Sequence, residues 1–222
     1  MQLIPAILAK DPLEFSKKLD ILDGTVEMVQ IDIMDGNFVP ETTFQDLDQA
    51  SSAMLEYELH LMVENPEEFI EQWQDVPNVK RAIIHAEIKK PLQPIIDQIH
   101  DLGWEAGIAI NPETSWKKIE KYLKEIETVL VMTVHPGKSG QPFEETVKKY
   151  NLLEKIKDLH HARPSLTISI DGGVNEETIP YLMQAGATRF TAGSAIFNDK
   201  DLIENYKKLE EVIMNEEVGS GE

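Results

Sequence analysis

Eight short apolar stretches rich in β-branched residues recur along the chain, and segments with helical spacing lie between them. Each stretch ends in Gly, Pro, Asn or Asp, which is typical of a strand buried on both faces of a parallel sheet. The stretches cover residues 3–9, 26–36, 57–63, 79–88, 104–112, 128–137, 165–174 and 188–197. Eight strands, each followed by a helix-sized segment, predict an α/β fold with a single (β/α)8 TIM barrel over residues 1–216.

The segments between the strands carry helix signals. Pro12 after Asp11 and Pro66 after Asn65 are typical of a helix start. Amphipathic patterns predict helices over residues 115–126, 144–159 and 201–214. A doubly wound open sheet is the alternative fold, but it usually has fewer strands and a glycine-rich turn after the first one, where this chain reads LAKDP. Residues 217–222 are expected to be an unstructured tail or a cloning remnant.

The amino-acid composition limits which kinds of molecule this protein is expected to bind. Forty acidic residues against 21 basic ones give a net charge of −19, which repels nucleic-acid backbones and argues against nucleic acid as a partner. The absence of cysteine excludes disulfides and thiolate metal sites. Because the sequence has no apolar run of membrane-spanning length and its start lacks the features of a signal peptide, we expect no membrane partner and a cytoplasmic location.

Polar residues at the ends of the predicted strands are the candidates for chemistry, because barrel sites form there. Asp32 and Asp171 each lie in an apolar strand, where a carboxylate is costly to bury unless it is paired or bound to a metal. Their strands are the second and seventh, three steps apart around a ring of eight. With His60 on the third strand they form a ligand set suited to Zn²⁺ or another divalent ion.

Two carboxylates on opposite sides of a bound substrate also suit removal of a proton from one face and its return to the other. The simpler alternative is that Asp32 and Asp171 only cap the loops that follow them. Asp35, which precedes Gly36, is interpreted as a turn residue. The remaining histidines are weaker candidates at strand ends (His85, His135) or solvated on helices (His100, His160, His161).

Glycines form a second group, at the ends of the sixth, seventh and eighth strands, in the segments HPGKSGQ, DGG and AGS. Glycine allows close approach to the backbone, so its N–H groups can hold a phosphate. The loops after strands seven and eight are the usual phosphate site of a TIM barrel. The alternative is that these glycines only make tight turns.

The sequence resembles the ribulose-phosphate 3-epimerase family over nearly its whole length. The resemblance is carried by IPAIL, QIDIMDGNFVP, ELHLMVENPE, AGIAINP, VLVMTVHPGKSGQPF, ISIDGGVNEET and AGATRFTAGSAIF, in this order. It implies an isomerase that inverts C3 of D-ribulose 5-phosphate to give D-xylulose 5-phosphate in the pentose phosphate pathway, through an enediolate. It also implies a divalent metal cofactor, with Zn first and Fe, Mn or Co as alternatives, and we expect a homo-oligomer.

The resemblance assigns roles to individual residues. Asp32 and Asp171 are implied as acid and base and as metal ligands, and His60 as a third ligand beside the substrate. The remaining residues are implied to contact the enediolate (Met34, Met62, Met132), to form a lid (Gly137, Lys138, Ser139, Gly140) and to bind phosphate (Gly172, Gly173, Gly193, Ser194).

Three positions depart from the family pattern. The usual metal histidine is Gln30, the usual serine of the first strand is Ala6, and the usual aromatic residue of the lid is Lys138. Gln30 is a poorer zinc ligand than imidazole, so the metal is expected to be weakly held or absent. Gln30 either offers a carbonyl oxygen to the ion or donates an N–H to the enediolate oxygen in its place.

The departures leave two alternatives to ribulose-phosphate epimerisation. One is epimerisation of another ketose phosphate, such as a hexulose 6-phosphate. The other is a sugar-phosphate-binding barrel with little or no turnover.

Overall fold

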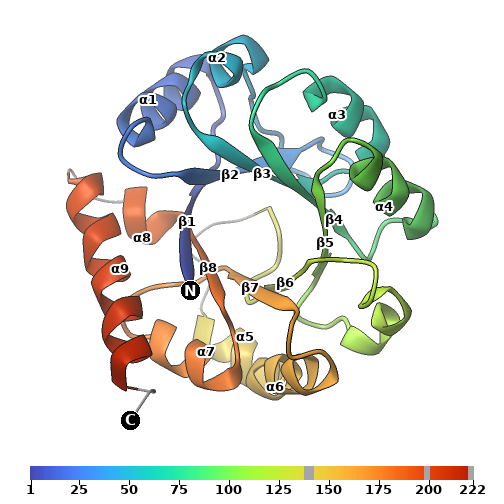
Figure 1. The fold of residues 1–222 in the computed structure, drawn as a ribbon, viewed down its shortest axis with the longest axis vertical. Coiled ribbons are helices and arrows are strands. Elements are labelled where there is room, and N and C mark those ends of the chain that lie inside the picture. The colour runs from blue at the N-terminus through green and yellow to red at the C-terminus, as the bar shows by residue number, and fades with distance from the viewer. Residues whose placement is uncertain (138–142, 198–200, 220–222) are drawn as a thin grey trace.

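The computed structural model describes residues 1–137, 143–197 and 201–219, in which eight parallel strands close into a barrel (Figure 1). Strand order around the ring follows chain order, and β1 pairs with β8. The strands are β1 (Gln2–Ile7), β2 (Met28–Met34), β3 (Glu56–Met62), β4 (Val79–His85), β5 (Glu105–Ile110), β6 (Thr128–Met132), β7 (Thr167–Asp171) and β8 (Arg189–Ala192). The predicted TIM barrel is confirmed, and the pairing of β1 with β8 excludes the open sheet.

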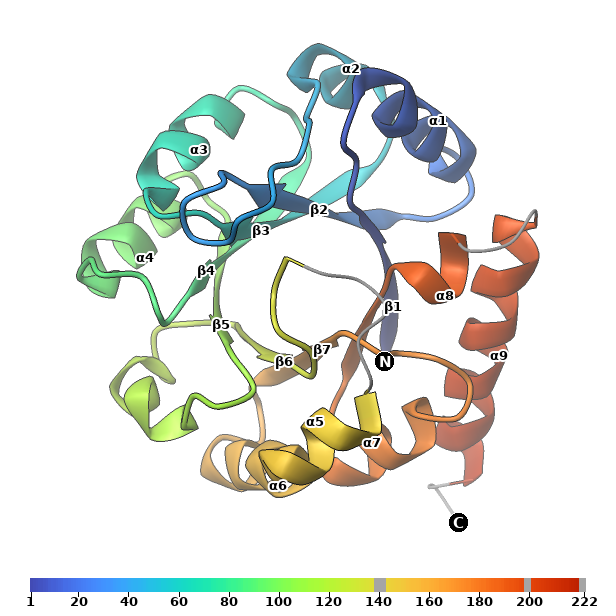
Figure 2. The ribbon, with the colours of Figure 1, turned by 180° about the vertical axis from the view of Figure 1, so that it is seen from behind.

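Helices surround the ring of strands, as the view from behind also shows (Figure 2). They are α1 (Pro12–Leu22), α2 (Leu47–Ser52), α3 (Pro66–Trp73), α4 (Leu92–Asp101), α5 (Phe143–Lys149), α6 (Leu152–Ala162), α7 (Ile179–Ala185), α8 (Ser194–Phe197) and α9 (Leu202–Gly219). The helix start at Pro12 is confirmed in detail, because the Asp11 carboxylate accepts the Glu14 backbone N–H at 2.9 Å. α3 also begins at Pro66, but the Asn65 side chain makes no capping hydrogen bond. Among the described residues no helix is long and apolar enough to span a membrane.

Two of the predicted helices differ from the expectation. Residues 115–126 contain two short 3₁₀ helices, Trp116–Lys118 and Glu120–Tyr122, in place of one α-helix. The buried side chains Trp116, Ile119 and Tyr122 are three residues apart, which is the period of a 3₁₀ helix.

The segment 144–159 is divided between α5 and α6 at Asn151, whose φ of 50° places it in the left-handed region. Asparagine tolerates that conformation better than most residues. At the C-terminus α9 continues to Gly219, further than the predicted boundary of the tail, and 220–222 lie outside the described residues.

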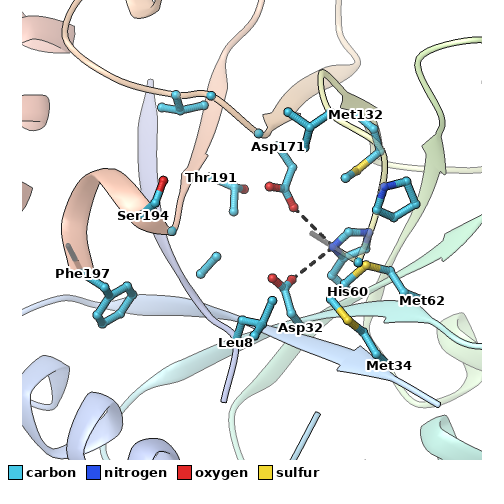
Figure 3. A pocket seen from close by; sticks show the side chains of 18 of the residues that line it. Leu8, Asp32, Met34, His60, Met62, Met132, Asp171, Thr191, Ser194 and Phe197 are labelled. Atoms are coloured by element: carbon cyan, nitrogen blue, oxygen red, sulfur yellow. Dashed lines mark hydrogen bonds and ion pairs between the residues drawn. The ribbon is translucent and has the colours of Figure 1, made fainter. Parts of the chain in front are cut away.

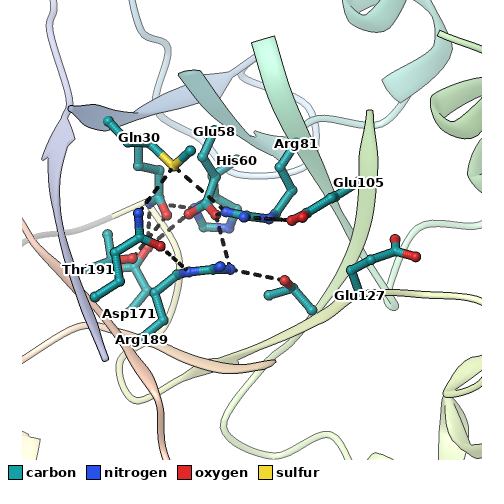
Figure 4. A network of polar contacts seen from close by, with 12 residues as sticks. Gln30, Glu58, His60, Arg81, Glu105, Glu127, Asp171, Arg189 and Thr191 are labelled. Carbon is teal, nitrogen blue, oxygen red and sulfur yellow. Dashed lines mark hydrogen bonds and ion pairs between the residues drawn. The ribbon is translucent and has the colours of Figure 1, made fainter. Parts of the chain in front are cut away.

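A layer of charged side chains fills the barrel below the ends of β2 and β3 (Figure 4). Glu58 is fully buried and forms a short ion pair with Arg81, and one Glu58 oxygen lies 3.8 Å from the Arg189 guanidinium. Arg81 also donates to Glu105 at 2.8 Å, and Arg189 donates to Thr128 at 3.0 Å. Because Glu58 precedes His60 by two residues on β3, this layer lies directly beneath the polar groups of the candidate site.

We expect Glu58→Gln to lower the free energy of unfolding by about 3 kcal/mol, because it removes a buried charge that faces two guanidinium groups. Urea unfolding followed by circular dichroism measures the change. The control is Glu56→Gln on the same strand, where the Lys80 ion pair is partly exposed and a loss of at most about 1 kcal/mol is expected. Equal losses in the two variants would show that the buried charge is not what stabilises this layer.

Candidate functional site

The carboxyl ends of β2, β3 and β7 bring together Asp32, His60 and Asp171 (Figure 3). His60 pairs directly with Asp32 in the β2–β3 register. Its Nδ1 lies 3.2 Å from Asp32 Oδ1 and 3.3 Å from Asp171 Oδ2, and one possible ligand atom from each residue lies within 4.8 Å of the others. The three residues singled out from the sequence therefore form one cluster, in which Asp32 and Asp171 both face His60 Nδ1.

Gln30 lies inside the barrel and joins this cluster from β2. Its side chain is fully buried, and its Nε2 donates to Asp32 Oδ1 at 2.7 Å and to Asp171 Oδ2 at 2.9 Å. The same nitrogen lies 3.4 Å from His60 Nδ1. On the other side of the amide, Oε1 accepts the Thr191 hydroxyl at 3.2 Å. The amide of Gln30 thus bridges the two carboxylates.

A second histidine and a glutamate determine which nitrogen of His60 faces the carboxylates. His85 Nε2 lies 2.9 Å from His60 Nε2, and His85 Nδ1 lies 3.3 Å from Glu87 Oε2. Burial opposes ionisation of Glu87, but its hydrogen bond to His85 lowers the Glu87 pKa to about 2. His85 therefore donates its Nδ1–H to a carboxylate and accepts the Nε2–H of His60, which turns His60 Nδ1 toward Asp32 and Asp171.

The electrostatics of the cluster reflect burial and like charge. Burial raises the pKa of Asp32, and the Asp171 carboxylate adds to the rise, against the hydrogen bonds from His60 and Gln30. Burial alone lowers the pKa of His60, but its hydrogen bonds to Asp171 and Asp32 outweigh this and raise it to about 9. A carboxyl group with a raised pKa close to a second carboxyl group suits proton transfer in both directions.

The cluster forms the floor of a cavity of about 410 Å³, a size suited to a small phosphorylated ligand. The cavity is lined on one side by the sulfur-containing chains of Met34, Met62 and Met132. Its lining also includes the strand-end residues predicted for phosphate: Gly172, Gly173, Gly193 and Ser194. The predicted lid residue Gly137 lines the cavity as well, whereas Lys138, Ser139 and Gly140 lie outside the described residues.

The backbone conformation at Gly172 and Gly173 requires glycine, whether or not a ligand binds there. Their φ angles are 106° and 59°, and a Cβ at either position would lie 2.5 Å from a neighbouring side chain. The turn interpretation therefore accounts for these two glycines by itself. Gly193 differs, because a Cβ there would meet nothing nearer than Ala6 at 3.9 Å.

Of the remaining residues considered from the sequence, one lies at the cavity and others lie away from it. His135 lines the cavity and pairs with Glu113 at 3.3 Å, whereas His100 pairs with Glu127 near the surface, away from the cluster. Asp35 has the predicted turn role, since its carboxylate accepts the backbone N–H groups of Asn37 and Phe38 at 2.8 and 2.9 Å.

Known proteins match this chain over most of its length. The model of the ribulose-phosphate 3-epimerase family matches residues 2–197. The chain belongs to this family. It is 33% identical over 218 residues to ribulose-phosphate 3-epimerase of Aquifex aeolicus, covering 96% of this chain and 97% of that protein. It is 33% identical over 210 residues to the Bacillus subtilis protein of the same name, covering 90% and 94%.

Solved structures show the same fold at lower identity. The 3-hexulose-6-phosphate synthase of Salmonella typhimurium superposes with a TM-score of 0.67 at 15% identity, covering 97% of this chain and 100% of that one. Orotidine 5'-monophosphate decarboxylase of Sulfolobus solfataricus gives a TM-score of 0.66 at 12% identity, covering 97% and 98%. At these identities the likeness concerns the barrel alone.

Members of the ribulose-phosphate 3-epimerase family usually bind a divalent metal, and Asp32, His60 and Asp171 form a possible site for one. Two carboxylate oxygens and one imidazole nitrogen fit such an ion in type and spacing. Gln30, the residue that the resemblance implies in place of a further metal ligand, does not fit as it lies, because it presents N–H donors to the cluster. An amide nitrogen carrying two hydrogens offers no lone pair to a metal.

Several residues of this epimerase-family site were missed from the sequence. Thr191 precedes Gly193 by two residues, so the alternation of β8 would have placed both on the inner face. Glu87 follows His85 by two residues, and this spacing was the available signal. Lys18 had no such signal: it lines the cavity from α1, donates to the Leu8 carbonyl at 2.6 Å and lies 5.0 Å from the Phe197 ring.

Proposed function

We propose that this epimerase-family protein inverts C3 of D-ribulose 5-phosphate to give D-xylulose 5-phosphate, with Asp32 and Asp171 as the acid–base pair. The observation that carries the proposal is the placement of these two carboxylates on opposite sides of the cavity floor, each held by the Gln30 amide and close to His60. Inversion at carbon requires a proton to leave one face and another to arrive at the opposite face. A single acid on one side could not supply both.

The rest of the cavity supports a phosphorylated ketose. Gly193 and Ser194 follow β8 and line the cavity, as the phosphate sites of TIM barrels commonly do. Lys18 also lines the cavity, close to the Phe197 ring of α8, and its ammonium group forms an ion pair with Glu14 at 2.7 Å. Met34, Met62 and Met132 provide an apolar wall that keeps water from the carbanionic carbon.

The reaction begins when one aspartate removes the C3 proton and leaves an enediolate. The second aspartate, protonated beforehand, returns a proton to the opposite face. A divalent ion held by Asp32, His60 and Asp171 would stabilise the negative charge of the enediolate. His60 keeps its Nδ1 toward the pair throughout, because His85 and Glu87 hold its other nitrogen.

Proton NMR of ribulose 5-phosphate incubated with the protein in D2O tests the proposal. We expect the C3 proton to be replaced by deuterium while xylulose 5-phosphate accumulates. Exchange only with a hexulose 6-phosphate would assign the protein to another ketose phosphate. Tight binding of the pentulose phosphate without exchange would indicate a binding protein and would contradict the proposal.

A further inference from the structure

Both polar atoms of the Gln30 amide have hydrogen-bond partners. Two N–H groups point to two different carboxylates, and the carbonyl oxygen accepts the Thr191 hydroxyl. The side chain has no exposed surface, and β2 pairs with β1 at Gln30 itself, opposite Ala6. A buried amide with every group satisfied is a stable arrangement of the site rather than an incomplete one.

The amide also reduces the repulsion between the two carboxylates, as a bound metal ion would. Two carboxylates drawn to one point repel each other unless something between them donates hydrogen bonds or carries positive charge. Hydrogen bonds to charged carboxylates are among the stronger ones in proteins. The Gln30 amide provides one such bond to each aspartate, at 2.7 and 2.9 Å, and supplements His60 Nδ1, which lies 3.2 and 3.3 Å from the same two oxygens.

A cation at this point would compete with the amide for the same atoms. Asp32 Oδ1 and Asp171 Oδ2 are the oxygens that accept from Gln30, and they are also the oxygens nearest His60 Nδ1. An ion between them would displace both hydrogen bonds. For Gln30 to become a ligand, its amide would have to turn over and its oxygen would have to leave the Thr191 hydroxyl.

We propose that Gln30 is a built-in substitute for the metal ion: its amide joins Asp32 to Asp171, keeps the site assembled in the metal-free protein and weakens the binding of divalent cations. Weak metal binding at Gln30 is expected whether or not the protein has the proposed function. That epimerisation needs no added ion is a further consequence, and it rests on the proposed function.

Zinc titration into metal-stripped protein, followed by calorimetry, tests the proposal without any activity measurement. We expect Gln30→His to bind zinc at least about tenfold more tightly than the parent, because imidazole replaces an amide that opposes the ion. Gln93→His, on the outer helix α4, is the control for an added histidine and should leave the affinity of the parent unchanged. Equal zinc affinity in Gln30→His and the parent would overturn the proposal.

Thermal unfolding of metal-stripped protein provides a second, independent measurement. Gln30→Met keeps the length of the side chain and removes both donors, so we expect its midpoint to fall by about 4 °C or more and to rise again when zinc is added. The parent should melt at the same temperature before and after stripping. A parent that keeps one zinc per chain through dialysis and melts lower once stripped would overturn the proposal, as would an unchanged midpoint in Gln30→Met.

If the metal-free parent epimerises ribulose 5-phosphate at full rate in the presence of a chelator, the consequence for turnover is also correct. If titration and melting agree with the proposal but no ketose phosphate reacts, the proposed function fails while the role of Gln30 stands. The two failures are therefore distinguishable.

Discussion

Asp171→Asn and Asp32→Asn should each lower the rate of epimerisation by about a thousandfold or more, because each removes one of the two groups that move the proton. Asparagine has nearly the shape of aspartate and can still accept a hydrogen bond from Gln30 through its carbonyl oxygen. We therefore expect both variants to fold. A coupled assay for xylulose 5-phosphate measures the rate, and circular dichroism confirms the fold.

Deuterium exchange separates the two aspartates in these variants. The variant that lacks the base for a given substrate should lose exchange at C3, whereas the variant that lacks only the acid should keep exchange without inversion. Asp35→Asn is the matched control, because Asp35 lies near the same strand end and its carboxylate accepts the backbone N–H groups of Asn37, Phe38 and Glu64. Near-parental turnover in either Asp32→Asn or Asp171→Asn would show that this carboxylate is not part of the acid–base pair.

The sequence was sufficient to predict the barrel because most of its strands are buried on both faces and contain consecutive apolar residues, as in Val129, Leu130 and Val131 of β6. The sequence predicted the helices less well, because an amphipathic pattern fixes neither the type of helix nor its exact ends. The spacing of Trp116, Ile119 and Tyr122 is compatible with an amphipathic helix of either period, and the structure has the 3₁₀ form. In the same way, Asn151 divides α5 from α6 through a left-handed residue that an amphipathic pattern does not show.

The candidate site was predictable where a polar residue interrupts an apolar strand. Asp32, His60 and Asp171 stand out in this way, and the closed ring then brings their strand ends to one mouth. The orientation of Gln30 was not predictable, since it depends on Thr191 and Asp171, which lie far away in the sequence. Both sequence alternatives assumed that Gln30 faces an ion or the substrate, whereas its amide faces the two carboxylates.

Gly193 offers the sharpest test of the phosphate end of the cavity. It lines the cavity with an ordinary backbone conformation, and the space around a Cβ at this position is open, with Ala6 the nearest neighbour at 3.9 Å. A larger side chain can therefore enter the cavity without distorting β8. We expect Gly193→Leu to weaken binding of ribulose 5-phosphate by about a hundredfold or more, since it fills the space and blocks approach to the backbone N–H groups.

Binding to Gly193→Leu is best measured in the Asp171→Asn background, where turnover does not consume the ligand, with the free energy of unfolding determined in parallel. Stability should change by no more than about 1 kcal/mol, as for a substitution outside the packed core. Gly172→Ala is the informative contrast: its φ of 106° and a Cβ 2.5 Å from Val134 should cost about 1–3 kcal/mol of stability through strain. If Gly193→Leu binds the phosphosugar as the parent does, the phosphate lies elsewhere in the cavity, and Lys18 on α1 becomes the group to test next.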